Sequence, residues 1–427
     1  MPYFFAEEEL LDRDGIVAVQ RRKFAAMVRA VLAGNAFYRG KLADVQSSQT
    51  DVAVESFPFT TRAELQQDQI SHSPFGTNLT FSLDQYTRLH QTSASFGEPL
   101  RVLDRNADWE WWRRCWGIIY RGAGVEPGDR FFFPFSFGPF IGFWAAFESA
   151  VAMGNMCLPA GGMTTSARLR SIVDHKVTVI CCTPTYALRM AEAAREEGVN
   201  LAGSAVRLLI VAGEPGGSIP STRTAIEAAF TARVVDHAGA TEVGPHSFEC
   251  VESPGGVHFI ESEFIVEAID PRSGNTVGEG EEGELVVTNL GRWGMPVIRY
   301  RTGDLVRLRR GQCRCGRHFA RAEGGILGRI DDMIFIRGNN VYPAQIEDIM
   351  RGIDGLAEYR IHVCRRGALN DLALELEPLP GVDAGAVQRR AEKAIQDRFH
   401  FRPSVRLAPP GTLPRFEMKA RRVVREA

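Results

Sequence analysis

The amino-acid sequence predicts an α/β protein. We expect a large N-terminal domain of mostly parallel sheets flanked by helices, a β subdomain, and a small mobile α+β C-terminal domain. Between residues 178 and 236, short apolar runs alternate with helical patterns of roughly ten to fifteen residues, as in βαβ units. From Glu263, apolar and polar residues alternate around Gly, Asp and Pro turns. After Arg329, strand and helix patterns alternate again.

The N-terminal elements are justified by apolar periodicity. Residues 16–45 are expected to form an amphipathic helix. Thr178–Thr183 and Val206–Ala212 are expected to be strands that lead into helices, and Val234–Asp236 begins a third short strand. Ligands of such sheets bind beyond the carboxyl ends of the strands, so the loops after the second and third strands are candidate sites.

The C-terminal elements have a different pattern. Residues 263–290 are expected to form antiparallel hairpins. Beyond Arg329 we expect strand, helix, strand, helix and a polar tail. The domains are therefore expected to span residues 1–329 and 330–427.

Composition excludes several classes of protein. The chain has 427 residues, 44% of them hydrophobic, and its net charge of -2 predicts no binding to nucleic acid or to an anionic membrane. Eight cysteines are too few for a disulfide scaffold. The N-terminus lacks a secretory pattern, and the apolar stretch 131–147 contains Pro and Gly and is shorter than the ~20 residues of a membrane-spanning helix. We expect a soluble, cytoplasmic protein.

Four segments carry residue types suited to a nucleotide, and each has an ordinary alternative. The loop 91–99, QTSASFGEP, could wrap phosphate oxygens or be a plain Ser/Gly loop. In AGATEVGP, Glu242 could hold Mg²⁺ or be a solvated turn residue. In RYRTGDL, Asp304 could accept hydrogen bonds from a ribose diol or hold its own turn. Lys419 could be functional or belong to a solvated tail.

Cysteines and one histidine could form a metal site. Cys313 and Cys315 form a tight pair, and Cys250 lies eight residues before His258. Three thiols and an imidazole complete a tetrahedral zinc set, although C-x-C is less diagnostic than paired C-x-x-C. The alternative is free buried cysteines, as expected for the other five, and His318 could replace His258.

Taken in order, these segments resemble the motifs of the adenylate-forming (acyl-CoA synthetase-like) superfamily, specifically its phenylacetate–CoA ligase-like branch. The resembling segments run from FTTRAEL at 59–65 through RLHQTSASFGEP, AGEPG, GATEVGP, PVIRYRTGDL and CRCGR to EMKARR. The resemblance implies two half-reactions. A carboxylate attacks the α-phosphate of ATP to give an acyl-adenylate and pyrophosphate, and a thiol, usually coenzyme A, then displaces AMP.

The resemblance also implies roles for single residues. Lys419 would neutralise charge as the acid attacks, Thr241 would bind the α-phosphate, and Glu242 would bind Mg²⁺. Asp331 matches the hinge of the mobile domain. Further nucleotide-binding residues implied are Thr92, Ser93, Ser95, Gly213, Glu214, Pro215, Asp304 and Arg329. Members of this branch carry cysteines and a histidine at places matching the zinc set.

The resemblance puts the acid pocket on the aromatic stretch 135–142. Phe135, Phe137 and Phe140 would supply flat apolar walls for an aromatic acid, although some of these rings are expected to be sheet core. His90 matches a histidine of the branch and would either orient the acid or be a satisfied structural residue. The phosphate loop departs from the family at Glu98, where the family carries lysine.

The sequence thus predicts an acid–thiol ligase that activates an aryl or arylacetic carboxylate with ATP and transfers it to coenzyme A. The implied cofactors are ATP, Mg²⁺, coenzyme A and structural Zn²⁺. Two alternatives stay open: an adenylate-forming amide synthetase or carrier-protein loader, and a non-catalytic protein that binds the acid or its adenylate. A homodimer is also left open.

Overall fold

The structure is a computed structural model that describes residues 2–43, 53–92, 98–336, 339–366, 369–417 and 419–425. Its N-terminal helices are α1 (Ala6–Glu9), α2 (Arg13–Gly34), α3 (Ala36–Lys41) and α4 (Arg62–Ser71), with a 3₁₀ turn at Val54–Ser56. The prediction of a single helix over residues 16–45 is wrong, because α2 ends at Gly34 and α3 begins after Asn35. The Asn35 side chain accepts from the Tyr38 amide and so begins a second helix.

A five-stranded parallel sheet forms the centre of the large part, as the alternating pattern predicts. Its order is β4-β3-β5-β6-β7. The strands are β3 (Arg130–Phe133), β4 (Met156–Pro159), β5 (Val179–Cys182), β6 (Leu208–Ala212) and β7 (Arg233–His237). The connecting helices are α6 (Trp144–Ala152), α7 (Thr165–Asp174), α8 (Pro184–Glu197) and α9 (Pro220–Phe230), and α5 (Asn106–Gly122) precedes β3.

An antiparallel seven-stranded sheet confirms the predicted hairpins. Its path is β10-β11-β12-β13-β9-β8, with β14 paired to β12. A separate hairpin of β1 (Tyr86–Gln91) and β2 (Arg101–Arg105) follows a 3₁₀ turn at Leu83–Gln85 and flanks the predicted phosphate loop. The strands of the larger sheet are β8 (Ser247–Phe248), β9 (Gly256–Phe259), β10 (Phe264–Ile269), β11 (Glu282–Asn289), β12 (Tyr300–Arg309), β13 (Arg321–Glu323) and β14 (Gly328–Arg329).

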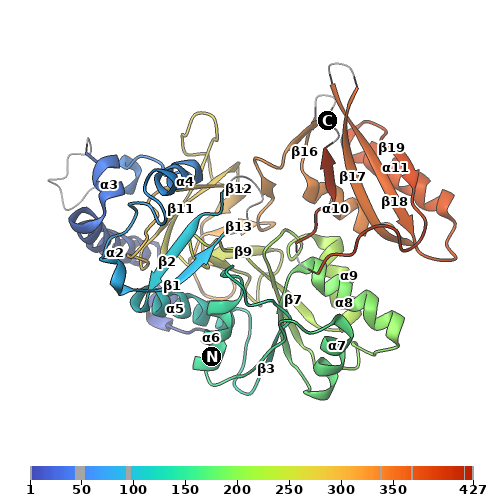
Figure 1. Ribbon diagram of the computed structural model, residues 1–427, viewed down its shortest axis with the longest axis horizontal. Coiled ribbons are helices and arrows are strands. Elements are labelled where there is room, and N and C mark those ends of the chain that lie inside the picture. The colour runs from blue at the N-terminus through green and yellow to red at the C-terminus, as the bar shows by residue number, and fades with distance from the viewer. Residues whose placement is uncertain are drawn as a thin grey trace.

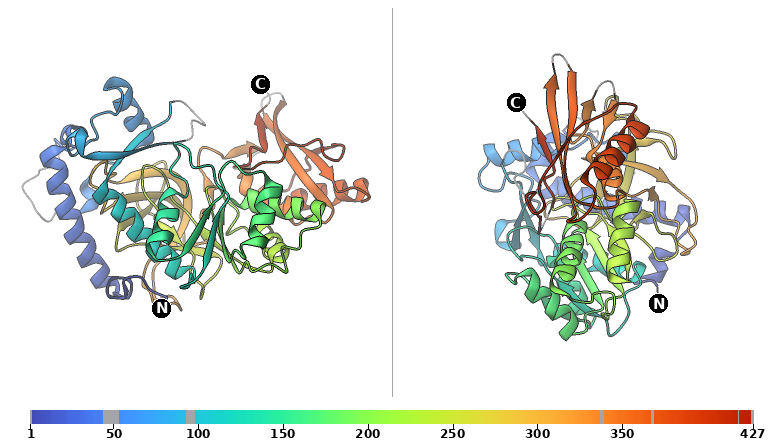
Figure 2. Two further views of the ribbon diagram at one scale, coloured as in Figure 1. Left: turned by 60° about the horizontal axis from the view of Figure 1, so that its bottom comes forward. Right: turned by 90° about the vertical axis from the view of Figure 1, so that its right-hand side faces the viewer.

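The C-terminal domain has its own hydrophobic cluster and its own sheet, β19-β18-β17-β20, beside a β15-β16 hairpin. It stands on α8 and α9 in Figure 1 and projects from the large part in both views of Figure 2. The expected strand–helix–strand–helix order is wrong in detail, because each expected strand is a pair of strands and the expected polar tail contains two more, β19 and β20. The elements are β15 (Ile334–Ile336), β16 (Asn339–Val341), α10 (Pro343–Arg351), β17 (Leu356–Arg366), β18 (Leu369–Pro378), α11 (Ala384–Phe399), β19 (Ser404–Leu407) and β20 (Val423–Arg425).

Within the described residues, no helix is both long enough and apolar enough to cross a membrane. The domain boundary at residues 329 and 330 stays a prediction.

Candidate active site

Lys419 of the C-terminal domain lies against the loop that follows β6. A Cβ added to Gly213, which has a φ of +95°, would lie 3.6 Å from Cε of Lys419. The next amide along the tail, that of Ala420, donates to Glu214 Oε2 at 2.8 Å. Glu214 Oε1 accepts from the Thr185 amide in the first turn of α8 at 3.0 Å. The Glu214 carboxylate therefore joins the tail to the helix, and Pro215 beside it is exposed.

The charge of Lys419 is set by its surroundings. Although the residue is open to solvent, desolvation by the nearby protein lowers the pKa of Lys419. The negative charges of Glu214, Asp304 and Glu242 oppose this lowering of the pKa of Lys419. Three residues predicted to bind different parts of a nucleotide thus favour the charged form of one ammonium group.

Glu242 is buried in the loop after β7, and the predicted phosphate loop begins beside it. The Tyr300 hydroxyl donates to Glu242 Oε1 at 2.7 Å, and Arg62 Nη1 lies 3.8 Å from the same oxygen. Arg62 Nη2 donates to Thr92 Oγ1 at 2.8 Å. Thr92 also exchanges two hydrogen bonds of 3.0 Å with the backbone of Leu100, which closes the base of the loop.

The other predicted phosphate residues, Ser93 and Ser95, lie outside the described residues. Sequence reasoning missed Arg62 and Tyr300 as parts of the site. Both stand within segments that resemble the family, FTTRAEL and IRYRTGDL, and this was the available signal.

Asp304 and Arg329 face each other across the β12–β14 ladder, where they are paired residues. Arg329 Nη1 donates to Asp304 Oδ1 at 3.1 Å, and Arg329 Nε donates to Asp331 Oδ1 at 2.9 Å. Burial raises the pKa of Asp304 to about 6, although the Arg329 charge opposes this shift. The strand register therefore links the predicted ribose residue to the predicted hinge residue through one guanidinium group.

Thr241 is held from behind by a buried ion pair. Arg292 Nη1 donates to the Thr241 carbonyl at 2.6 Å. The same guanidinium group makes two bonds of 2.7 Å to Asp104, and both side chains are fully buried. This bidentate pair fixes the backbone of the loop that carries Thr241 and Glu242.

His90 is a buried residue near the end of β1. Its ring stacks on Trp109 with centroids 5.4 Å apart. Its buried Nδ1 has no hydrogen-bond partner among the described residues, and Asp104 Oδ2 is 4.0 Å away. Burial and the nearby Arg292 and Arg88 charges lower the pKa of His90 to about 4.

The predicted acid pocket is an aromatic cluster at the end of β3. Phe135 and Phe137 are half-buried with ring centroids 5.5 Å apart, and Phe140 is also half-buried. Gly142 has a φ of +35° and has no room for a Cβ, which would lie 1.9 Å from the Phe135 ring. The Gln91 amide donates to the Pro139 carbonyl at 2.8 Å, which ties this segment to the His90 strand.

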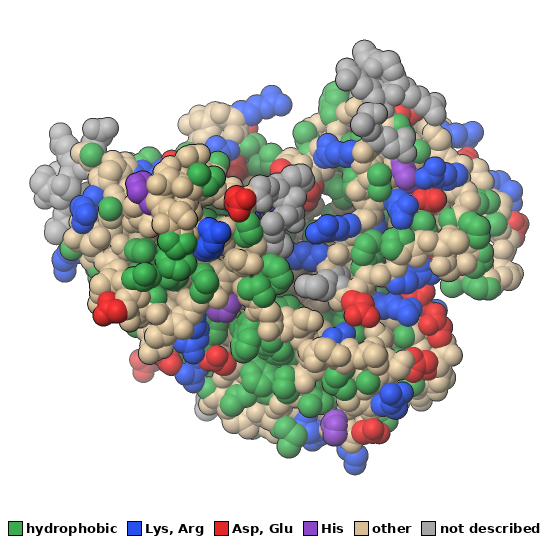
Figure 3. Space-filling model, in the orientation of Figure 1, with side chains coloured by type: hydrophobic (Ala, Val, Ile, Leu, Met, Phe, Trp, Pro, Cys, Tyr) green, Lys and Arg blue, Asp and Glu red, His purple; other side chains and the backbone are tan. Residues whose placement is uncertain are grey.

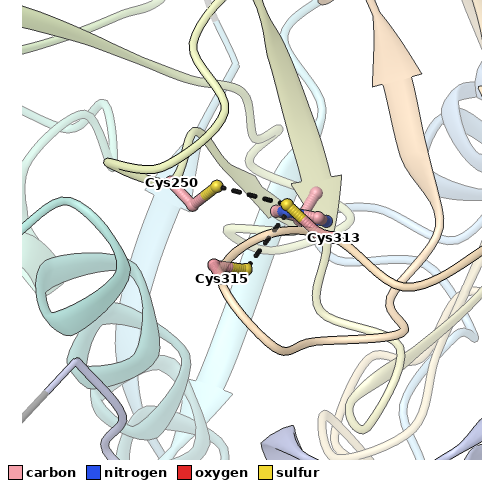
Figure 4. Close-up of side chains that lie close together, drawn as sticks. Cys250, Cys313 and Cys315 are labelled. Carbon is pink, nitrogen blue, oxygen red and sulfur yellow. Dashed lines mark hydrogen bonds between the residues drawn. The ribbon is translucent and has the colours of Figure 1, made fainter.

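The four predicted metal-ligating residues meet at one point, and Figure 4 shows the three cysteines among them. One ligand atom from each of Cys250, His258, Cys313 and Cys315 lies within 4.8 Å of all the others. The Cys250 and Cys313 sulfurs are 3.8 Å apart, and Cys315 Sγ is 3.7 Å from His258 Nε2. His258 Nδ1 lies 3.2 Å from the Phe319 carbonyl, so Nε2 is the nitrogen available to a metal. His318, the alternative ligand, is not in the cluster.

The N-terminal segment covers the loop of this cluster. The Tyr3 hydroxyl donates to the Cys315 carbonyl at 2.7 Å. Arg317 Nε donates to Glu9 Oε2 at 2.9 Å, and both side chains are buried. Sequence reasoning missed this contact, because the two residues lie 308 positions apart.

The C-terminal domain is held in its position by polar contacts with α8 and α9. Arg415 joins Glu192 on α8, at 2.9 Å, to Glu377 of its own domain, at 2.6 Å. The Ser221 amide on α9 donates to Asp348 Oδ1 at 3.2 Å. Lys and Arg side chains gather along this junction in Figure 3.

Within the C-terminal domain, Arg422 anchors the tail that carries Lys419. It makes bonds of 2.8 and 3.0 Å to the two Glu358 oxygens. The tail is therefore fixed at two points just after Lys419, by the bond from Ala420 to Glu214 and by the pair of Arg422 with Glu358.

A lysine that the C-terminal domain places beside a loop at the carboxyl edge of a parallel sheet is the arrangement expected of an adenylate-forming enzyme. Comparisons with known proteins agree with this class. Residues 92–292 match the AMP-binding enzyme family, and residues 338–426 match the AMP-binding enzyme C-terminal domain. The chain is 32% identical to phenylacetate–coenzyme A ligase of Thermus thermophilus over 98% of both chains. It is 32% identical to the Escherichia coli ligase of that name, over 87% of this chain and 84% of the relative.

Solved structures of 2-hydroxyisobutyryl-CoA ligase give a structural match. In the postadenylation state with 2-HIB-AMP, the TM-score is 0.93 at 28% identity, over 100% of this chain and 93% of that chain. In the thioesterification state with coenzyme A, over the same shares, the TM-score falls to 0.76 at 29% identity.

The chain belongs to the phenylacetate–CoA ligase branch of the AMP-binding enzymes. The family, the fold class and the class of enzyme predicted from the sequence, an AMP-forming acid–thiol ligase, are confirmed.

Proposed function

We propose that this chain activates an aryl or arylacetic carboxylate with ATP as the acyl-adenylate and transfers the acyl group to coenzyme A. One observation carries this proposal: Lys419 of the C-terminal domain lies against Gly213 in the loop after β6, and the amide that follows it bonds Glu214 of the same loop. A cation there stabilises charge that develops as the acid attacks phosphorus. The relatives named phenylacetate–coenzyme A ligase support the acid class and the acceptor.

The site residues would bind different parts of the nucleotide. Asp304 would accept hydrogen bonds from the ribose hydroxyls, and Gly213 and Glu214, with Pro215, would flank the adenine. Thr241 and Thr92 would hold phosphate oxygens, with Ser93 and Ser95. Arg62 lies between Thr92 and Glu242, so its guanidinium group would also face phosphate.

Mg²⁺ fits Glu242, because Mg²⁺ prefers oxygen ligands and a buried carboxylate supplies them. Tyr300 fixes one oxygen of this carboxylate, and no described residue donates a hydrogen bond to the other. When bound, Mg²⁺ neutralises charge on the phosphate oxygens.

Two domains would share the work. Residues 330–427 would form a lid that turns about Asp331 between the half-reactions. The separate hydrophobic cluster of the C-terminal domain supports this division, as does the better match to the postadenylation state of the solved ligase.

Release of pyrophosphate from ATP tests this function. A panel of aryl and arylacetic acids is assayed with and without coenzyme A. We expect acid-dependent pyrophosphate release and a coenzyme A-dependent thioester. Adenylate without thioester would instead favour the amide synthetase or carrier loader, and binding without pyrophosphate release would favour the non-catalytic protein.

We also propose that Cys250, His258, Cys313 and Cys315 bind a structural zinc ion. Tetrahedral zinc with bonds of about 2.3 Å to sulfur separates two sulfur ligands by about 3.8 Å, and the Cys250 and Cys313 sulfurs lie 3.8 Å apart. The ion would tie the segment after β8 to the loop before β13, and these two segments are far apart in the sequence. The four ligands are separate from the predicted nucleotide-binding residues.

Elemental analysis of protein purified without chelator tests this proposal. We expect about one zinc per chain, and a lower melting temperature after chelation, because metal binding stabilises only the folded state. Cys157→Ser, outside the cluster, is the control and should keep the metal. Metal-free protein whose melting temperature is unchanged by chelator would contradict the proposal.

Two further expectations stay predictions. A homodimer would be detected by analytical ultracentrifugation, and a cytoplasmic location by cell fractionation.

A further inference from the structure

His237 is the last residue of β7, five positions before Glu242, and the nucleotide roles leave it unused. Its ring lies against Trp116 with centroids 4.5 Å apart. Trp116 in turn contacts Phe143, which contacts Phe135 of the predicted acid pocket, with centroid distances of 6.2 and 5.8 Å. His237 therefore joins the aromatic cluster to the loop that carries Thr241 and Glu242.

The hydrogen bonds of His237 fix its tautomer. Nδ1 lies 2.6 Å from the Ser247 carbonyl oxygen, which can only accept, so Nδ1 carries the proton. Burial lowers the pKa of His237 to about 4, so the imidazole is neutral at pH 7. In a neutral ring with Nδ1 protonated, Nε2 is a hydrogen-bond acceptor.

The acceptor nitrogen faces a glycine. A Cβ added to Gly239 would lie 3.5 Å from Nε2 of His237, so any side chain at this position would cover the nitrogen. Gly239 itself is exposed, although His237 is only 6% exposed. The absence of a side chain at Gly239 leaves this edge of the imidazole open beside the reacting loop.

We propose that His237 is a specificity-determining residue whose Nε2 accepts a hydrogen bond from a ring hydroxyl or amino group of the acid. The proposal rests on the proposed function and deepens it, because it names the substrate class: an aromatic acid that carries a neutral O–H or N–H donor. The rings of Phe143 and Phe135 are apolar, and Trp116 adds an indole N–H donor that has no hydrogen-bond partner among the described residues. Among these four, His237 supplies the hydrogen-bond acceptor that would orient the substrate.

An unsubstituted aromatic acid would leave this acceptor without a partner in a place that holds little water. A site built to bond a substrate hydroxyl disfavours the analogue that lacks it. We therefore expect a preference of about tenfold or more in kcat/KM for one hydroxylated or aminated acid over its unsubstituted parent. The preference should appear mainly in KM, since the bond forms before reaction and persists through it.

The experiment compares phenylacetate and benzoate with their ortho-, meta- and para-hydroxy and amino derivatives, in the wild type and three variants. His237→Leu removes the acceptor and should abolish the preference. His237→Gln places an amide oxygen near Nε2 and should restore part of it. Phe143→Leu alters only an apolar wall and should lower kcat/KM for both members of a pair alike.

A preference below about twofold at every ring position, or one that persists in His237→Leu, would overturn the proposal. Calorimetry on the wild type with sulfamoyl analogues of the paired adenylates gives the same comparison if a variant fails to fold. It also separates the two claims. If no acid yields a thioester, the proposed function fails, whereas equal affinity for the paired analogues overturns the role of His237 alone.

Discussion

Asp304 is the site residue whose charge should change near physiological pH. Burial raises the pKa of Asp304 to about 6, so the carboxyl is protonated below that pH and ionised above it. The ionised form accepts hydrogen bonds on both oxygens with a full negative charge, whereas protonation makes one oxygen a donor and weakens the bonds to the ribose hydroxyls. We expect kcat/KM for ATP, which reports the free enzyme, to fall as the pH drops through about 6. In Asp304→Asn it should be low and lack this decrease. The same profile in both proteins, between pH 5 and 8, would exclude Asp304 as the cause.

Glu98 stands at the other end of the phosphate loop. Its carbonyl is held by Gln66 Nε2 at 2.6 Å, and its side chain is exposed. A negative charge near the triphosphate is unfavourable, although solvent weakens the effect. We expect Glu98→Lys to lower the KM for ATP by about threefold or more without changing acid selectivity. The control, Glu110→Lys on α5, makes the same charge change and should leave that KM unaltered. An unchanged KM in Glu98→Lys would show that this side chain has no effect on ATP.

At the residue scale, functional residues that belong to a sequence motif can be predicted from the sequence. Residues whose role depends on their neighbours in the folded chain cannot. Lys419, Glu242 and Asp304 stand within recognisable segments, and the fold brings them together. Arg62, Tyr300 and His237 have no local pattern of their own. Their importance depends on neighbours far along the chain, such as Thr92, Glu242 and Trp116.

At the scale of elements, the contact between α8 and the C-terminal domain can be tested. Glu192 bonds Arg415 across the junction, and the pair is partly exposed, so it contributes about 0.5–1 kcal/mol. We expect Glu192→Gln to slow adenylate formation about two- to fivefold, because the present arrangement of the domains is less favoured. Thioester formation from supplied adenylate should not slow.

Single-turnover rates of the two half-reactions check this expectation. Glu196→Gln is the matched control, since its carboxylate lies on the same helix but pairs with Arg189 of that helix. Equal slowing of both half-reactions in Glu192→Gln would argue against a role of this pair in domain position.

Elements were predicted well where periodicity is strong and poorly where a polar contact decides. The β5, β6 and β7 strands follow from their apolar runs. The break at Asn35 does not, because its cause is a capping bond together with buried bonds to Asn78 and Thr80. The short strand β20 pairs with β17 more than 50 residues earlier, and no local pattern encodes such a pairing.

At the scale of the whole molecule, the predicted fold class and the family are confirmed. The position of the C-terminal domain could not be predicted from the sequence, because it depends on contacts such as Glu214 with Ala420 and Arg415 with Glu192. Those contacts bring Lys419 to the nucleotide residues. They would have to break if the proposed lid turns between the half-reactions.

The role of Lys419 in adenylate formation is tested by the rate of each half-reaction in Lys419→Ala. Adenylate formation is followed by pyrophosphate release from ATP and acid, and thioester formation by AMP release from synthetic adenylate and coenzyme A. We expect the rate of adenylate formation to fall by about 10²-fold or more, because the lost cation stabilises charge that develops as the acid attacks. The second rate should stay within about threefold of the wild type, since the lid has by then carried Lys419 away. Equal loss in both half-reactions, or unimpaired adenylate formation, would contradict the account.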